Sequence, residues 1–325
     1  MKKIRIFLAL IFFLFPASAA LFSAYDGGVT APILSYSLGS RAYAMAGAFT
    51  ALADDTTSCF WNPAGLVQIH RQEVAGYFEF LFAGGSYFSV GYAYPIWNLG
   101  VASATFMYLG SSEIQGMSAY LEDLGMMNSY QYLINLSFAQ KLSFYKRYLF
   151  GLKYFDAGAT LKLMGTGLNQ KETGSLGKFG VGLDLGFKYY PTHFTFRHSE
   201  FLRNMVVGLK LNNVLPPTVK FSTQRDWYMP EMIIGLLYRT LYDTLNVTVD
   251  MQYTFARKRD LRPKIGAEYT VYKIVRLRAG FNGELTFGGG INLEDFKFDY
   301  AAGYNFDLGF VHHISATYYF GEIVP

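Results

Sequence analysis

The chain of 325 residues has a single cysteine, Cys59. One cysteine cannot form an internal disulfide, so the fold is held without a covalent cross-link. Charged residues make up only 16% of the chain, and no run of Lys and Arg is interleaved with aromatic residues. Such a run is the usual footprint of nucleic-acid binding, so we expect no nucleic-acid partner.

The N-terminal residues have the pattern of a secretory signal. Lys2, Lys3 and Arg5 precede an apolar run over residues 6–15, and Ala17-Ser18-Ala19 offers a small-residue cleavage site. This run is too short for a membrane helix, which needs about 20 residues. We predict a signal peptide over 1–19 without a lipid anchor, because no cysteine begins the mature chain.

Apolar residues are plentiful but never gather into a second long run. They make up 51% of the chain, aromatics make up 18%, and mean hydropathy is only +0.16. Residues 245–255, LNVTVDMQYTF, show how a high apolar content is compatible with a low mean hydropathy. Apolar and polar side chains alternate, so one face of a strand is apolar and the other carries Asp250. Residues 179–189 alternate in the same way around Asp184 and Lys188.

Fourteen segments of this kind follow one another, and no long amphipathic helix lies between them. We therefore predict an all-β protein without helices to cover an apolar sheet face. The predicted strands begin near Glu73, Gly85, Asn98, Ser129, Leu152, Lys178, Asn204, Pro230, Thr244, Arg262, Ile274, Leu285, Phe296 and Gly309.

Two architectures suit such strands: a secreted β-sandwich or solenoid with its apolar faces inside, and a transmembrane barrel with its apolar faces in lipid. Most segments run for about 9–13 residues, near the length that crosses a bilayer and longer than typical sandwich strands. An even number of strands places both termini in the periplasm, and aromatic residues gather at strand ends as in the girdles of barrels. These features favour a 14-stranded antiparallel transmembrane β-barrel over residues 71–325, monomeric and in contact with membrane lipid.

Charged residues within the strands fall on the polar face. A cation on the lipid face costs about 2–4 kcal/mol at mid-membrane, so we expect the charges to line the lumen. We interpret them as wall residues rather than catalysts: Lys162, Asp184, Lys188, Lys210, Asp250, Lys264, Glu268, Arg276 and Arg278.

Residues 20–70 precede the first strand and include SRAYAMAGAFTALADDTTSCFWNPAGL. The many Ala and Gly residues allow backbone to pack closely on backbone, which suits a plug inside a barrel of this width. A disordered periplasmic leader is the alternative, although Phe49, Phe60 and Trp61 are unusual in disordered segments. We expect an N-terminal hatch in which Arg41, Asp54 and Asp55 meet the charged wall.

This stretch resembles the N-terminal hatch of the FadL-like outer-membrane barrels, in particular the PorV/PorQ family and a related uncharacterised spirochaete outer-membrane family. The shared pattern is Gly-x-Arg-Ala, then Ala-Phe-Thr-Ala, Ala-Asp-Asp and Asn-Pro-Ala-Gly. The later segment NNVLPPTVKF also resembles the family. The resemblance implies that the hatch and gating residues are Arg41, Asp54, Asp55, Trp61, Asn62, Pro63, Ala64 and Gly65.

FadL-like membership implies a bacterial outer-membrane location and transport of long-chain fatty acids or other hydrophobic small molecules. In that mechanism a kink in the third strand opens the wall, and Gly100 is its candidate counterpart here. The PorV branch implies an alternative, a binding or shuttle role for exported proteins in type IX secretion.

The longest expected outer connection, residues 108–128, carries an adaptable apolar set suited to lipid-like molecules. A loop packed over the mouth would look the same. Its candidate ligand-capture residues are Met117, Tyr120, Leu121, Leu124 and Met126.

The sequence gives no sign of catalysis. The five histidines form no zinc helix motif, and Gly-x-Ser-x-Gly does not occur. His312 and His313 point to opposite faces of one strand, so they cannot share a metal. We expect no enzymatic activity, no cofactor and no metal site.

Overall fold

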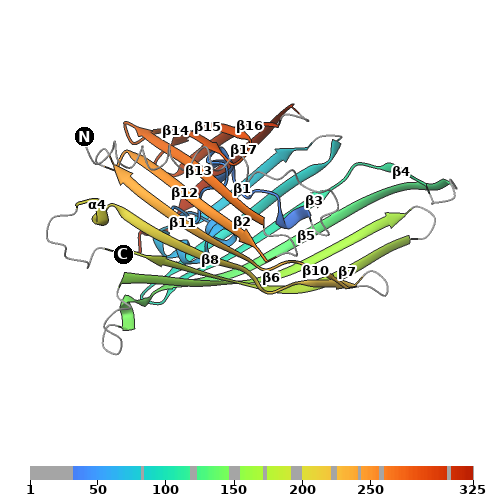
Figure 1. Ribbon diagram of the computed structural model, residues 1–325, viewed down its shortest axis with the longest axis horizontal. Coiled ribbons are helices and arrows are strands. Elements are labelled where there is room, and N and C mark those ends of the chain that lie inside the picture. The colour runs from blue at the N-terminus through green and yellow to red at the C-terminus, as the bar shows by residue number, and fades with distance from the viewer. Residues whose placement is uncertain are drawn as a thin grey trace.

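The computed structural model describes residues 32–81, 84–117, 123–145, 154–170, 174–191, 200–220, 225–240, 243–255, 260–305 and 309–324. The predicted signal peptide therefore lies outside the described residues. The strands form one antiparallel sheet that closes on itself (Figure 1). The ring closes because β1 pairs with β17 and β3 pairs with β5, so the predicted 14-stranded barrel is confirmed.

The barrel strands begin within a few residues of their predicted positions, apart from β5. Period-two alternation located them because each strand has lipid on one side and the lumen on the other. They are β1 (Gln72–Phe80), β2 (Ser86–Ile96), β3 (Gly100–Gly110), β5 (Asp123–Lys141), β6 (Phe155–Gln170), β7 (Gly174–Tyr189), β8 (Met205–Leu215), β11 (Glu231–Thr240), β12 (Leu245–Thr254), β13 (Asp260–Val271), β14 (Val275–Phe281), β15 (Leu285–Asn292), β16 (Phe296–Asn305) and β17 (Gly309–Phe320).

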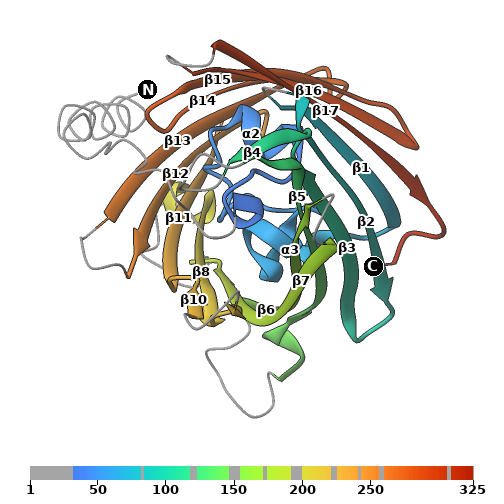
Figure 2. The same cartoon turned by 90° about the vertical axis from the view of Figure 1, so that its right-hand side faces the viewer.

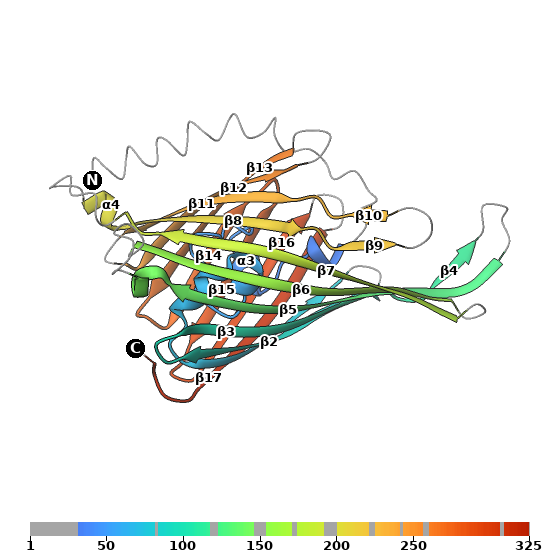
Figure 3. The same ribbon diagram turned by 90° about the horizontal axis from the view of Figure 1, so that it is seen from below.

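We call the end where β1 begins and β17 ends the base, and the other end the far end. Here β5, β6 and β7 are longer than expected, at 19, 16 and 16 residues, and extend past their neighbours at the far end (Figure 3). The expected outer connection over 108–128 is thus largely strand: it contains the end of β3, β4 (Ile114–Met117) and the start of β5. The prediction of a loop there was wrong, because β4 folds back on β5 and continues its ladder.

In the barrel wall, apolar side chains point outward and charged side chains point into the lumen, as the alternation predicts. On β14, Leu277 is 53% exposed on the outside while Arg278 is 4% exposed inside. On β7, Phe179 and Val181 are exposed, whereas Asp184 and Lys188 are buried. The apolar exterior has the form required of a lipid-facing surface, because charges are kept away from it.

Residues 32–70, which we call the luminal segment, lie inside the ring of strands (Figure 2). The segment consists of short turns: η1 (Pro32–Leu34), α2 (Ser40–Ala44), α3 (Ser58–Trp61) and η2 (Pro63–Gln68). Ala42, Ala48 and Leu52 are at most 1% exposed. Among the residues that the structure describes, no helix is long and apolar enough to cross a membrane.

The chain ends are tied together at the base. His70 O accepts a hydrogen bond from Val324 N at 2.7 Å, and His70 Nδ1 lies 3.2 Å from Val324 O. Arg71 links the chain ends to the β15–β16 turn through an ion pair with Asp295, with 2.8 Å between Nη2 and Oδ1. The first and last strands are thus held together by side chains as well as by their ladder.

The third strand shows no kink at Gly100. This residue begins β3 with φ of 145°, and β3 is paired from there to Gly110 with β2. Its other edge pairs with β5 without a shift from Val101 onward. A side chain at Gly100 would collide with the Ala139 carbonyl, so glycine is needed for close strand packing.

Candidate functional site

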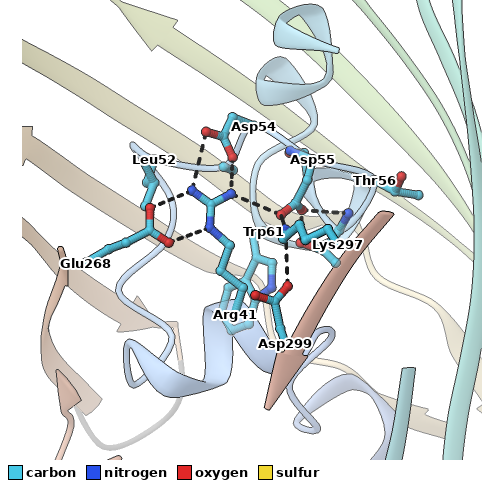
Figure 4. Close-up of polar contacts among 12 residues, drawn as sticks. Arg41, Leu52, Asp54, Asp55, Thr56, Trp61, Glu268, Lys297 and Asp299 are labelled. Atoms are coloured by element: carbon cyan, nitrogen blue, oxygen red, sulfur yellow. Dashed lines mark hydrogen bonds and ion pairs between the residues drawn. The ribbon is translucent and has the colours of Figure 1, made fainter. Parts of the chain in front are cut away.

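Six charged side chains form a closed loop of alternating sign near the base of the lumen, and we call it the charge ring. Arg41 binds Glu268 with two nitrogens, at 2.8 and 2.9 Å (Figure 4). The ring runs through Arg41, Glu268, Arg278, Asp299, Lys297 and Asp55 and back to Arg41, with successive nitrogen–oxygen distances of 2.8, 2.7, 2.7, 3.3, 3.3 and 3.2 Å.

The charge ring joins the luminal segment to the wall. Arg41 and Asp55 belong to the segment, while the other four members lie on β13, β14 and β16. Asp54 adds another carboxylate to the Arg41 guanidinium. A buried ion pair is costly to break, because the partner left behind keeps an uncompensated charge. The ring therefore specifies one position for the segment.

Burial alone would raise the pKa of the Asp55 carboxyl. The positive charges of Lys297 and Arg41 outweigh burial, and the pKa of Asp55 lies well below its usual range. Asp55 also accepts a hydrogen bond from the Thr57 hydroxyl at 2.5 Å. The carboxylate is consequently ionised at neutral pH and remains available to both cations.

Asn62 fixes the second turn of the luminal segment. Its Nδ2 donates to Thr50 O at 2.8 Å and to Phe187 O on β7 at 3.1 Å, while its Oδ1 accepts from Ala64 N at 3.2 Å. This pattern joins two parts of the segment and the wall. No aliphatic side chain of similar size could supply both the donor and the acceptor.

The neighbouring predicted residues complete the same turn. Trp61 donates from Nε1 to Leu38 O at 2.8 Å. Pro63 starts η2, where a missing N–H costs nothing. Gly65 lies against the Ala53 carbonyl, where any side chain would clash, and Ala64 is fully buried. All eight predicted hatch residues thus lie within the lumen, although their gating role remains a prediction.

Wall side chains satisfy the polar backbone of the luminal segment. Asp250 Oδ2 accepts from Phe49 N at 3.0 Å and from Thr50 N at 2.9 Å. Lys188 donates to the carbonyls of Leu52 and Ala53. Because buried backbone groups are costly when unpaired, these charged wall residues let an irregular segment lie in the interior.

Glycines on the inner face of the wall lie where the luminal segment passes. A Cβ at Gly280 would overlap the backbone of Met45 and Ala46, and one at Gly208 would overlap that of Thr50. The small residues of the segment are matched in this way by small residues of the wall. The glycines in contact with the segment are Gly91, Gly158, Gly186, Gly208, Gly235, Gly266, Gly280, Gly288 and Gly303.

Toward the far end the lumen holds mostly apolar side chains, with the buried Glu79 and His313 hydrogen-bonded to Tyr77 among them. Buried side chains from the luminal segment and from the wall form a group that we call the apolar cluster. Two methionines, Met107 and Met164, are fully buried in it, and methionine adapts to different neighbours. The members are Ile33, Leu38, Cys59, Tyr77, Tyr87, Met107, Leu109, Leu133, Met164 and Tyr228.

A small cavity of about 30 Å³ lies between the charge ring and the first two strands. Arg41, Asp55, Lys297 and Asp299 contribute to its lining, together with Ser and Thr hydroxyls. A cavity of this size has room for ordered water beside the charge ring. No group of three or more His, Cys, Asp or Glu side chains that could hold a metal was found in the described part of the chain.

Three of the predicted ligand-capture residues lie on strands near the far end. Met117 is on β4, and Leu124 and Met126 are on the far-end extension of β5. Met126 is 39% exposed. Tyr120 and Leu121 lie outside the described residues. The described members of this set thus belong to strands rather than to an apolar loop.

Several site residues were not among those predicted from the sequence. Lys297 and Asp299 complete the charge ring, and Glu73 accepts from both the N–H and the hydroxyl of Thr56. The alternation in FKFDY places Lys297 and Asp299 on the polar face, so it already contained the signal. Nothing in the sequence indicated which segment residue each would contact.

Comparison with solved structures shows that the fold is similar to that of known outer-membrane channels. The Ralstonia pickettii toluene transporter TbuX superposes with a TM-score of 0.61 and 14% identity, covering 87% of this chain and 98% of that one. The monoaromatic hydrocarbon channel CymD gives 0.60 and 13%, covering 92% and 100%. A Pseudomonas aeruginosa FadL homologue gives 0.56 and 11%, covering 87% and 98%.

No protein-family model matches the sequence, and no curated protein matches it. At these levels of identity the structural similarity concerns the fold alone. It supports the FadL-like barrel that the sequence predicted, and the PorV/PorQ branch remains a prediction.

Proposed function

We propose that this protein is a bacterial outer-membrane channel for hydrophobic small molecules, with long-chain fatty acids among its ligands. The observation that carries the proposal is the division of the lumen: the apolar cluster lies toward the far end and the charge ring toward the base. With both termini in the periplasm, the far end faces outward. A ligand arriving from outside meets the apolar cluster first.

Binding would replace contacts that the luminal segment now makes with the wall. Ile33 and Leu38 supply apolar side chains to the cluster from the segment, alongside Met107 and Leu133 from the wall. Apolar contacts are not directional, so a hydrocarbon chain or ring can substitute for them at little cost. The charge ring keeps the rest of the segment in place, and it would have to open for the segment to act as a hatch.

Three solved proteins with similar folds are described as a toluene transporter, a monoaromatic hydrocarbon channel and a FadL homologue. Their descriptions agree with hydrophobic cargo but do not choose between fatty acids and aromatic hydrocarbons. A cluster with five methionine or leucine side chains and three tyrosines is suited to either class.

The test is ligand binding by the purified protein in detergent, with radiolabelled oleate and radiolabelled toluene as probes. Met107→Glu places a charge in the apolar cluster, and we expect it to abolish binding because the carboxylate must be desolvated. Tyr272→Ser, at a 91% exposed turn residue, is the matched control and should bind as wild type does.

Saturable oleate or toluene binding that Met107→Glu removes would support the proposal. A wild-type protein that binds neither probe, and that instead co-purifies with an exported protein, would overturn it in favour of the shuttle role. Mass spectrometry of molecules retained by the purified barrel distinguishes the two outcomes.

A further inference from the structure

Three polar side chains lie at one level of the wall beside the apolar cluster, and we call them the polar row. Glu79 of β1 is opposite His313 of β17 on one side and opposite Tyr87 of β2 on the other. All three point into the lumen and are at most 4% exposed. Tyr87 is itself a member of the apolar cluster. The row thus places a carboxylate, an imidazole and a phenol against an apolar surface.

A chain of hydrogen bonds holds the Glu79 carboxylate in place. The Tyr77 hydroxyl donates to Glu79 Oε2 at 2.9 Å, and it lies 2.6 Å from His313 Nδ1. Because the single hydroxyl proton of Tyr77 is used on Glu79, His313 Nδ1 must carry a proton and donate to Tyr77. This chain uses Oε2, and a carboxylate can accept hydrogen bonds on both of its oxygens.

The Tyr87 hydroxyl is buried without a hydrogen-bond partner among the described residues. Buried polar atoms are nearly always paired, because burying one alone costs free energy. Tyr87 can supply a donor, and Glu79 beside it can supply an acceptor. A neutral hydroxyl group matches both, since its oxygen accepts and its proton is donated.

The luminal segment already places a phenol against Tyr87. The ring centroids of Tyr36 and Tyr87 are 5.3 Å apart, and Tyr36 packs against the apolar cluster. Burial raises the pKa of Tyr36, and the charge of Glu79 raises it further, so this phenol is neutral. Tyr36 lies in the chain between Ile33 and Leu38, whose apolar contacts a ligand would replace. A ligand that takes their place would bring its own ring to Tyr87.

We infer that the polar row selects hydrophobic molecules that carry a neutral hydroxyl, in particular phenols. This inference rests on the proposed function and names a ligand class within it. The ring of the ligand replaces the ring of Tyr36. Its oxygen accepts a hydrogen bond from Tyr87, and its hydroxyl donates one to Glu79.

Two other ligand classes fit the polar row less well. A hydrocarbon of the same size leaves the Tyr87 hydroxyl unpaired. A carboxylate meets the negative charge of Glu79 in a buried place, where repulsion is little screened. A site built to bind a hydroxyl discriminates strongly against the analogue that lacks it, so the polar end of the ligand decides between molecules of similar size.

The test compares three probes that share one methylated ring: toluene, p-cresol with a hydroxyl, and p-toluate with a carboxylate. Affinities for the purified protein are measured by equilibrium dialysis of the radiolabelled probes, with the same detergent on both sides. For the wild type we expect p-cresol to bind about tenfold more tightly than toluene. We expect p-toluate to bind more weakly than toluene.

Two variants test the two members of the polar row separately. Tyr87→Phe removes only the hydroxyl, so affinity for p-cresol should fall to about that for toluene, with toluene binding unchanged. Glu79→Gln removes the charge and keeps an acceptor, so p-toluate should bind about tenfold more tightly than to the wild type. Tyr92→Phe is the control, because the Tyr92 hydroxyl bonds to Gln72 on the exposed outer face, and it should bind all three probes as the wild type does.

Equal affinity of the wild type for p-cresol and toluene would overturn the inference and leave the proposed function standing. A Tyr87→Phe variant that keeps the preference for p-cresol would overturn it as well. If Tyr87→Phe loses toluene binding through misfolding, Glu79→Gln decides, and unchanged p-toluate binding there overturns the inference. A wild type that binds none of the three probes and no oleate would instead refute the proposed function itself.

Discussion

The two ends of the lumen hold the same segment in different ways. At the base, Arg41 and Asp55 form directional ion pairs with Glu268 and Lys297 of the wall. Toward the far end, Ile33 and Leu38 are held by apolar packing. Ion pairs accept few substitutes, whereas apolar contacts accept many. The ion pairs at the base therefore fix the position of the luminal segment. Toward the far end, a ligand can replace the apolar contacts of the segment.

Removing the central cation should have the largest effect. Arg41→Ala removes the guanidinium that Glu268, Asp54 and Asp55 share, which opens the charge ring and leaves three buried or half-buried carboxylates with fewer cations. We expect unfolding free energy to fall by about 3–5 kcal/mol. Single-channel conductance should rise because the segment is no longer held. Arg71→Ala, which breaks a partly exposed pair with Asp295, is the control and should cost less than about 1 kcal/mol. Equal losses in the two variants would contradict the role of the ring.

A cavity in the apolar cluster should cost somewhat less. Met164→Ala removes a fully buried side chain, with an expected loss of about 2–5 kcal/mol in urea unfolding. Met164→Leu conserves volume and should cost less than about 1.5 kcal/mol. Neither variant should raise conductance, since the charge ring is intact. A conductance increase in Met164→Ala would show that the two ends of the lumen are not independent.

Loss of the Asn62 side chain should have an intermediate effect. Asn62→Ala leaves the carbonyls of Thr50 and Phe187 without these donors, at a cost of about 1–3 kcal/mol. Limited proteolysis should then cut the luminal segment faster. Gln68→Ala, which removes one partly buried bond to Tyr190, should change the rate little. Equal cleavage of both variants would place the anchoring elsewhere.

Acid should weaken the ion pairs that hold the luminal segment at the base of the barrel before it affects the apolar packing toward the far end. The pKa of Asp55 is lowered in the folded protein, so its ionisation contributes stability that is complete above the ordinary aspartate pKa of about 4. That contribution is lost as pH falls from there toward the depressed folded pKa. Unfolding free energy measured from pH 7 to pH 3 should decline below about pH 4, and less so in Asp55→Asn. A pH dependence unchanged by Asp55→Asn would contradict this assignment.

The fold could be predicted because the alternation of apolar and polar residues follows from the position of each strand between lipid and lumen. Each barrel strand separates lipid from a filled lumen, so FKFDY and LNVTVDMQYTF have the same two-residue period. The early start of β5 could not be found in this way, because residues 123–128, DLGMMN, place Met126 and Met127 side by side and do not alternate between apolar and polar side chains.

The site was predicted in part. Arg41, Asp54 and Asp55 stood out as charges in an Ala-rich stretch, and Glu268 and Arg278 stood out on the polar face of their strands. Their pairing depends on the height at which the segment lies in the barrel. That height is set by contacts between distant residues, such as Met45 with Gly280, which a linear pattern does not encode.

The order of the charge-ring residues along the chain has a consequence for assembly of the protein. The luminal segment is synthesised first, yet its ionic partners lie on β13, β14 and β16, near the end of the chain. The ion pairs of the segment can therefore form only after β13 to β16 have been made. A chain that ends before β16 would lack Lys297 and Asp299 and could not close the charge ring.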